Sequence, residues 1–233
     1  MKNRSSGARK RRRRTAMGVS KTDFVRGLQC PKMLWLDSHR PEEKIIPEEV
    51  QIKLDEGNAF GDRAMNIFGA YVETTCYRAD GRLDYKRMLE KTSECLKDGT
   101  PVICEAAFSW YGNYCAADIL KKTATGYELY EVKNAPAVRK EFLIDLGFQS
   151  FLLKKCGVAI EKCCLILRGE REGEYRIEDE TDAARALERT ADRKIWTFSR
   201  LKKQSEEPCV SVGEQCDEPY RCWYYEYCHG EKR

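Results

Sequence analysis

The sequence lacks both a long apolar run and an export signal. No stretch approaches the roughly 18 consecutive apolar residues that a membrane-spanning helix needs. The N-terminus is basic, but no apolar segment follows it, as a secretory signal would require. We therefore expect a cytoplasmic protein without a membrane partner, and its 233 residues are enough to bury one sizeable core.

The net charge of +4 belongs to one end of the chain. Residues 1–14 carry eight lysines and arginines and no acid, and subtracting these eight leaves the rest of the chain at −4. The sequence predicts a disordered basic arm over residues 1–17, able to contact nucleic acid phosphates or acidic surfaces. An alternative is that the arm is not native, because Met17 stands just before the first helix signal.

Cysteine, in contrast, is abundant, with twelve residues in a chain that shows no export signal. Disulfides are rare in a reducing compartment, so these cysteines do not read as a disulfide framework. Seven of them lie in apolar or amphipathic stretches and are predicted to be small core residues: Cys76, Cys95, Cys104, Cys115, Cys156, Cys163 and Cys164. The other five require a different explanation.

The remaining pattern alternates helices with strands. Ser20-Lys-Thr-Asp23 resembles a capping box and predicts the start of an amphipathic helix that continues to Leu36. The order of the later segments predicts an α/β fold with a mixed sheet, since the first strands form hairpins and a helix crosses to the last. Helices are expected over residues 47–68, 83–96, 140–155 and 181–203, and strands over 101–110, 114–121, 127–133 and 161–168.

Two acidic residues and a lysine stand on neighbouring predicted strands. Asp118 lies in Cys-Ala-Ala-Asp-Ile-Leu, and Glu131-Val-Lys133 begins thirteen residues later. Because strand side chains alternate, Glu131 and Lys133 share one face, and a hairpin would bring Asp118 beside Glu131. Two such carboxylates are poor neighbours unless a cation lies between them, and oxygen ligands suit Mg²⁺ or Mn²⁺. A lysine beside that ion can position or help deprotonate a water and stabilise charge on a phosphate.

Asp-x₁₂-Glu-x-Lys alone is a weak pattern, and the three residues could instead be solvated strand residues that form an ordinary ion pair. The segments around these three residues make the pattern more specific. CEAAF, AADIL, YELYEVKNA and DLGFQSFLL, taken in order, resemble the core motifs of the PD-(D/E)XK nucleases. The resemblance is greatest to the RecB-type branch, which includes the CRISPR-associated exonucleases. It implies a restriction-endonuclease-like mixed sheet flanked by helices, with the core at about residues 100–170 of a single domain over 18–233.

The resemblance also implies roles for individual residues. Asp118 and Glu131 match the residues that bind the metal, and Lys133 matches the lysine of the family. Gln149 matches the glutamine of the following helix, which helps to orient the site. Glu105, on the preceding strand, matches an acidic position often found near the metal, although a surface carboxylate is the alternative there.

The chain departs from this family at one position. Many RecB-type members have a metal-binding histidine after a glycine in the helix before the sheet, whereas residues 56–64 contain no histidine. His39 and His229 are the only histidines, and neither has the required place or spacing. The difference implies either that water completes the coordination or that the activity is altered.

Four of the remaining cysteines form a pattern that spans the chain. Cys216, Cys222 and Cys228 recur at six-residue intervals, and with Cys30 of the first helix they would make a four-thiolate site. This arrangement resembles the iron–sulfur clasp of the RecB-type nucleases, which implies a 4Fe–4S cluster that ties the chain ends together. Structural Zn²⁺ is the rival, and Cys209 permits a local site, although the spacing is not the usual zinc CxxC pair. Four aromatic residues are expected to shield a cluster from water, with stacking on nucleic acid bases as the alternative: Trp223, Tyr224, Tyr225 and Tyr227.

These observations predict a Mg²⁺- or Mn²⁺-dependent deoxyribonuclease with a helical N-terminal part and a cysteine-rich tail. Its expected substrate is DNA, and its expected setting is DNA repair, recombination or CRISPR-type processing, with possible protein partners. One alternative is a catalytically silent nuclease fold that binds DNA or a partner, which the missing histidine favours. Another is a zinc-stabilised nucleic-acid-binding protein.

Overall fold

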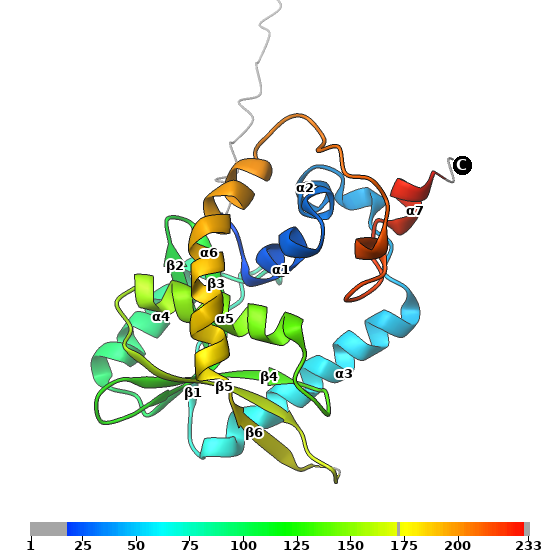
Figure 1. Ribbon diagram of the computed structural model, residues 1–233. Helices are drawn as coiled ribbons and strands as arrows, with labels where there is room; N and C mark the ends of the chain where they lie inside the picture. The colour runs from blue at the N-terminus through cyan, green and yellow to red at the C-terminus, as the bar shows by residue number, and fades with distance from the viewer. Residues whose placement is uncertain (1–17, 172, 231–233) are drawn as a thin grey trace, which may run out of the picture.

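A mixed β-sheet of six strands crosses the protein in the computed structural model, which describes residues 18–171 and 173–230 (Figure 1). Strands β2, β3 and β4 form an antiparallel meander, β4 and β5 run parallel, and β6 returns antiparallel. The expected α/β fold with a mixed sheet is confirmed. The basic arm predicted for residues 1–17 lies outside the described residues. The strands follow chain order across the sheet: β1 (Val72–Glu73), β2 (Val102–Trp110), β3 (Asn113–Lys122), β4 (Tyr127–Lys133), β5 (Ile160–Arg168) and β6 (Tyr175–Asp179).

Helices precede, interrupt and follow the sheet. The order from α4 to β5 agrees with the sequence prediction, because a tight turn joins β2 to β3 and α5 carries the chain across to the parallel strand β5. None of the described helices is both long and apolar enough to cross a lipid bilayer. The helices are α1 (Lys21–Gln29), α2 (Pro31–His39), α3 (Glu48–Ala64), α4 (Tyr85–Asp98), α5 (Lys140–Lys155), α6 (Thr181–Leu201) and α7 (Tyr225–His229), with 3₁₀ turns η1 (Pro41–Glu43), η2 (Met65–Phe68) and η3 (Glu214–Cys216).

The predicted helix from Ser20 to Leu36 is wrong in one respect, because it breaks into α1 and α2 at Cys30. Cys30 is extended, with φ −153° and ψ 116°, and it caps α2, whose first residue is Pro31. A proline disfavours helical geometry in the residue before it and has no N–H to donate, so one continuous helix cannot pass this point. The sequence pattern does not predict β1 and β6, since β1 has two residues and β6 lies largely exposed at the sheet edge.

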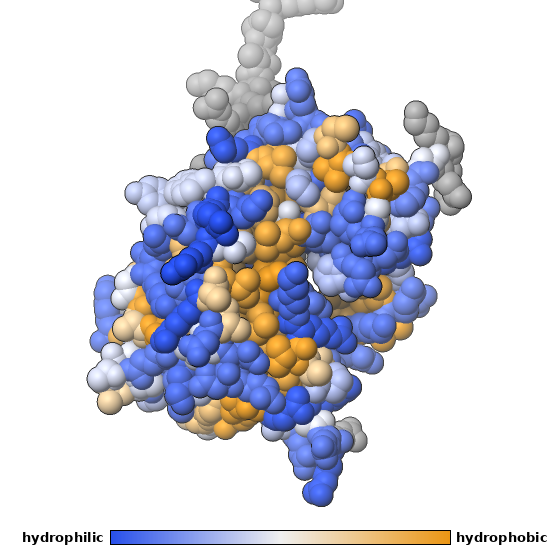
Figure 2. Space-filling model, in the orientation of Figure 1, coloured by the Kyte–Doolittle hydropathy of each residue, from blue (hydrophilic) through white to orange (hydrophobic). Residues whose placement is uncertain are grey.

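Two apolar layers hold the sheet between helices. On one face, the ring of Phe24 in α1 stacks on that of Phe148 in α5, with centroids 4.8 Å apart, and meets that of Phe198 in α6 edge to face at 5.6 Å. Burying each ring contributes roughly 1.5–3 kcal/mol. The other face has a smaller apolar layer to which η2 contributes Met65. Figure 2 shows an apolar band across the middle of an otherwise hydrophilic face.

The cysteines of the core are placed largely as predicted. All twelve are free thiols. Cys76 is only half-buried, and the prediction is wrong for Cys156, which is exposed because it follows the last buried turn of α5 as its cap. Five of the seven predicted core cysteines are buried: Cys95, Cys104, Cys115, Cys163 and Cys164.

The C-terminal segment returns to pack beside the N-terminal helices α1 and α2 (Figure 1). Gln29 at the end of α1 donates hydrogen bonds from Nε2 to the carbonyl oxygens of Gln215 and Tyr220, at 3.0 and 2.8 Å. The indole N–H of Trp35 donates to the carbonyl of Gln204 at 3.0 Å. These long-range contacts hold α1 and α2 in place above the sheet.

Candidate active site

The strands β3 and β4 separate at one end and open into a cavity. They are paired from Ile119 to Lys122 of β3, and the pairing stops before Asp118. There Asp118 Oδ2 instead accepts a hydrogen bond from the backbone N–H of Val132 at 2.8 Å. The fork opens into a cavity of about 950 Å³, lined also by residues of α1, α3 and α4.

Glu131 is the most enclosed carboxylate of this site, with 1% of the residue exposed. It accepts from Lys133 Nζ at 2.7 Å, from Gln149 Nε2 at 2.6 Å, and from Lys21 Nζ at 3.0 and 3.1 Å. Burial alone would raise the pKa of Glu131, but the charges of Lys133 and Lys21 hold that pKa well below its usual range. Glu131 is therefore ionised at neutral pH.

Lys133 bridges β4 and α5. Its ammonium lies 2.7 Å from Glu131 Oε1 and 2.7 Å from Asp145 Oδ2. Burial opposes the charge, but the carboxylates of Asp145 and Glu131 raise the pKa of Lys133 above its ordinary value. Lys133 is therefore a fixed cation at neutral pH, able to position a water or stabilise negative charge but not to accept a proton.

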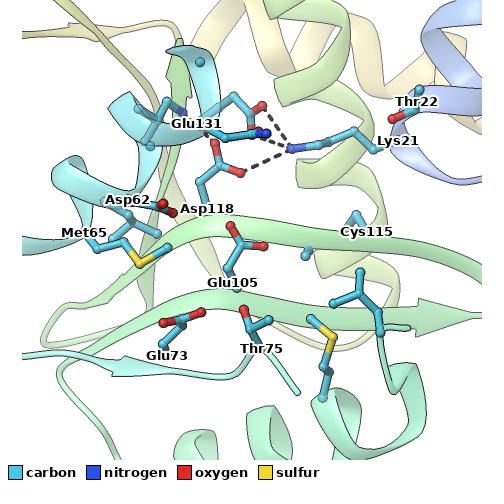
Figure 3. A pocket seen from close by; sticks show the side chains of 18 of the residues that line it. Lys21, Thr22, Asp62, Met65, Glu73, Thr75, Glu105, Cys115, Asp118 and Glu131 are labelled. Atoms are coloured by element: carbon cyan, nitrogen blue, oxygen red, sulfur yellow. Dashed lines mark hydrogen bonds and ion pairs between the residues drawn. The ribbon is translucent and has the colours of Figure 1, made fainter. Parts of the chain in front are cut away.

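A second lysine enters the site from α1. The ammonium of Lys21 lies between the carboxylates of Glu131 and Asp118, 3.3 Å from Asp118 Oδ1, as the dashed lines in Figure 3 mark. Burial works against its charge, but Asp118 and Glu131 raise the pKa of Lys21 well above its ordinary value. The capping box at Ser20 and Asp23, which the sequence predicts, starts α1 at the mouth of the cavity and so places Lys21 there.

Glu105 lies on β2 in the register position opposite Asp118 (Figure 3). Its backbone has φ +54°, in the left-handed region that residues other than glycine rarely adopt, and Thr74 Oγ1 donates to its carbonyl at 2.5 Å. Burial, and then the charge of Asp118, raises the pKa of Glu105 to about 8. Burial, and then Glu131, raises the pKa of Asp118 to about 6. Crowded carboxylates of this kind become easier to ionise when a cation joins them.

The donor set fits Mg²⁺ or Mn²⁺. Asp118, Glu131 and Glu105 offer carboxylate oxygens on one wall of the cavity, and hard divalent cations prefer such ligands. As the side chains lie, no three His, Cys, Asp or Glu residues in the described part of the chain are already arranged as a metal site. At Asp118 and Glu131 the ammonium of Lys21 holds the place that a metal cation would take.

The helix that would carry the family histidine faces the same cavity. α3 contributes Gly57, Asn58, Gly61 and Asp62 to the lining, and no described lining residue is a histidine. His39 stacks on Trp35 at the end of α2, and His229 lies in α7. Neither residue is among the described ones that line the cavity. The two histidines are therefore not brought to the carboxylates.

The four cysteines of the predicted clasp line one small, mostly apolar cavity, with Met33 and Tyr224 around them. They are Cys30, Cys216, Cys222 and Cys228. Burial raises the pKa of Cys222 to about 11, so this thiol is protonated at neutral pH unless a bound metal favours the thiolate and its proton is released. Four thiols that line one cavity would suit an iron–sulfur cluster or a zinc ion if their side chains turned toward a common centre.

The fifth cysteine and one aromatic residue do not join this cavity. Cys209 is exposed and is not among the described lining residues, so the local site that includes it is not assembled. Tyr224 and Tyr225 line the cavity, and Tyr227 packs in the same apolar cluster. Trp223 instead lies against two cations, with Arg26 Cζ at 4.3 Å and Lys44 Nζ at 4.5 Å from its ring centroid.

The structure brings together the five residues proposed from the sequence for the catalytic site, and it adds two. Lys21 and Asp145 contact the predicted residues directly, yet the strand pattern of Asp118, Glu131 and Lys133 gives no signal for either. Comparison of the chain with protein-family models and with curated proteins gives no match.

Proposed function

We propose that the protein is a metal-dependent deoxyribonuclease with a PD-(D/E)XK core of the RecB type. The observation that supports this most is the convergence of Asp118, Glu131 and Lys133 in one cavity at the fork of the sheet, with Gln149 hydrogen-bonded to Glu131 from behind. The order of α4, β2–β4, α5 and β5 agrees with what the sequence resemblance implies.

Each side chain has a role that follows from its contacts. Asp118 and Glu131 would hold the ion, and Glu105 would add a third carboxylate from β2. When bound, Mg²⁺ or Mn²⁺ lowers the pKa of an attacking water and stabilises charge on a phosphate. Lys133 positions that water or the phosphate as a fixed cation, and the Gln149 amide orients Glu131 by its 2.6 Å hydrogen bond.

The cysteine cavity supports a second part of the proposal. Cys30, Cys216, Cys222 and Cys228 would hold a 4Fe–4S cluster that ties the C-terminal segment to α1 and α2. Zn²⁺ would suit the same four thiolates, and measurement of iron, sulfide and zinc in protein purified without oxygen decides between them. In either case the metal stabilises the fold around the cavity rather than taking part in catalysis.

The test is cleavage of end-labelled single- and double-stranded DNA with Mn²⁺ or Mg²⁺. Wild-type protein is compared with Lys133→Ala, and with Lys162→Ala as a control, since Lys162 is an exposed lysine of β5 that does not line the cavity. We expect metal-dependent cutting that Lys133→Ala abolishes and Lys162→Ala retains. Cutting that continues in Lys133→Ala would contradict the proposed site.

A silent nuclease fold that binds DNA or a partner protein is the second candidate, and one observation favours it. α3 brings no histidine to the cavity, and Asn58 and Asp62 face it instead. DNA binding without cutting, in wild type and Lys133→Ala alike, would support this candidate over the nuclease.

A further inference from the structure

Lys21 combines a fixed backbone with a movable ammonium group. The N–H of Asp23 donates to Ser20 Oγ at 3.1 Å, and the N–H of Ser20 donates to the Asp23 carboxylate at 2.8 Å. Lys202, just after α6, binds the same carboxylate at 2.5 Å. The first turn of α1 is therefore held on both sides. The side chain of Lys21 is 23% exposed and ends in the cavity on a flexible four-carbon stem.

The two lysines of the site are held in different ways. Lys133 has one partner, Asp145, that lies on α5 and is not among the three candidate metal ligands. In the described part of the chain, Lys21 is paired only with Asp118 and Glu131, the two carboxylates assigned to the ion. A divalent cation bound by these carboxylates would repel the Lys21 ammonium and remove both of its partners, whereas Lys133 would keep Asp145.

We propose that Lys21 is a displaceable cation. A bound metal ion displaces its ammonium from the two metal-binding carboxylates, and the ammonium then binds the substrate. This inference rests on the proposed nuclease function. In the metal-free protein the ammonium of Lys21 neutralises Asp118 and Glu131 and keeps them together. When Mg²⁺ or Mn²⁺ takes that place, the ammonium turns into the open cavity and binds a phosphate of the DNA strand to be cut.

The surroundings of Lys21 fit a phosphate as its second partner. Ser20 and Thr22, on either side of it, also line the cavity, and Figure 3 shows Thr22 beside Lys21 at its edge. An ammonium on a long stem binds phosphate as a mobile point charge. Because α1 is anchored, the distance that Lys21 can move is limited to the reach of its own side chain. The displaced ammonium therefore stays beside the metal-binding carboxylates.

Acetylation of wild-type protein tests the exchange without any substitution. Brief treatment with an N-hydroxysuccinimide ester of acetic acid, followed by peptide mass spectrometry, measures how accessible each lysine amine is. We expect Mn²⁺ to increase the labelling of Lys21 several-fold. Lys53, which lines the same cavity from α3 and forms no ion pair among the described residues, should label equally with and without Mn²⁺. A DNA oligonucleotide added to Mn²⁺-loaded Lys133→Ala protein should protect Lys21 again.

Metal affinity provides a second measurement. Lys21→Met removes the competing cation, so Mn²⁺, followed by titration calorimetry or by the electron paramagnetic resonance of the free ion, should bind several-fold more tightly. Lys53→Met removes a charge from the same cavity without freeing a ligand and should leave the affinity nearly unchanged. A circular dichroism spectrum identifies a variant that has not folded. In that case the acetylation of Lys21 in wild-type protein, with and without Mn²⁺, is the test of displacement.

Failure of this proposal and failure of the proposed function give different results. If Mn²⁺ binds and DNA is cut, but the labelling of Lys21 is the same with and without Mn²⁺, Lys21 is a permanent structural ion pair and the exchange is wrong. If DNA leaves the metal-exposed Lys21 labelled, its phosphate role is wrong. If Mn²⁺ fails to bind wild type, or binds Asp118→Asn equally well, the metal site itself is misplaced and both proposals fall.

Discussion

Lys133 Nζ and Asp145 Oδ2 lie 2.7 Å apart and join the end of β4 to α5. Among the described residues, Glu131 is the only proposed metal ligand that pairs with Lys133, and the second partner of this lysine is Asp145. Asp145 thus acts through Lys133, as a positioning residue. Its Oδ1 is buried and accepts no hydrogen bond among the described residues, so its one strong contact is with this lysine.

We predict that Asp145→Asn slows DNA cleavage by about 10–100-fold, the usual effect of losing a partner that orients a metal-site group. The amide keeps the shape of the side chain but removes the charge that pairs with Lys133 and fixes its ammonium. Rates at saturating DNA, with Mn²⁺ affinity measured in parallel, check this. A variant that cuts as fast as wild type would show that Lys133 needs no support from α5.

The cysteine cavity leads to a prediction with a control inside the same segment. Cys216→Ser removes one of the four thiols, whereas Cys209→Ser changes an exposed thiol outside the cavity. Protein purified without oxygen should be brown, with a broad absorbance near roughly 400 nm from thiolate-bound iron. Cys216→Ser should lose this colour and melt at a lower temperature, and Cys209→Ser should retain both properties.

The metal content of the purified protein distinguishes an iron–sulfur cluster from zinc. Colourless wild-type protein that contains stoichiometric zinc and no iron would exclude the iron–sulfur cluster but retain the four-thiolate site. Loss of metal from Cys209→Ser to the same extent as from Cys216→Ser would contradict the set of ligands.

The strand-borne part of the site could be predicted from the sequence, because strand geometry is local. Alternation alone puts Glu131 and Lys133 on one face, and a short hairpin puts Asp118 on the neighbouring strand. The helix after Pro136 is also predicted correctly, since α5 spans the predicted residues 140–155.

What could not be predicted depends on packing between distant segments. The capping box predicts a helix that begins at Lys21, but the local sequence does not indicate where that helix packs. Its position depends on contacts with distant segments, among them Lys202 and the C-terminal segment. The break at Cys30 could have been anticipated from Pro31, since proline restricts the residue before it. Cys156 was misplaced because an apolar stretch does not show where its buried face ends.

Close packing of α5 on α6 depends on Gly147. A Cβ there would lie 2.7 Å from Leu187 Cβ and 3.0 Å from the carbonyl oxygen of Ala184, both on α6. We predict that Gly147→Ala lowers the free energy of unfolding by about 1–3 kcal/mol through overpacking. Gly61→Ala in α3 is the matched control, because its Cβ meets nothing within 4 Å and alanine favours a helix by roughly 1 kcal/mol. Urea denaturation should show opposite signs, and equal signs would contradict the packing argument.

Asp37 links the two chain ends through charge. Its carboxylate binds Arg26 at 2.6 Å and Lys44 at 3.0 Å, and it accepts from the hydroxyl of Tyr224 at 2.9 Å. The same two cations also lie within 4.5 Å of the ring centroid of Trp223. Removing this carboxylate therefore leaves two largely enclosed cations and a buried tyrosine without their acceptor.

We predict that Asp37→Asn lowers the free energy of unfolding by roughly 3 kcal/mol, the scale for breaking a buried ion pair. Asp80→Asn is the control, because Asp80 pairs with Arg82 at 3.9 Å on the exposed surface, where such pairs contribute about 0–1 kcal/mol. Chemical denaturation of both variants measures the difference. Since Asp37 holds the tail against α1 and α2, Asp37→Asn should also release the metal of the cysteine cavity more readily to a chelator. Equal stability of the two variants would mean that the ends are held by the cysteine cavity and its apolar neighbours alone.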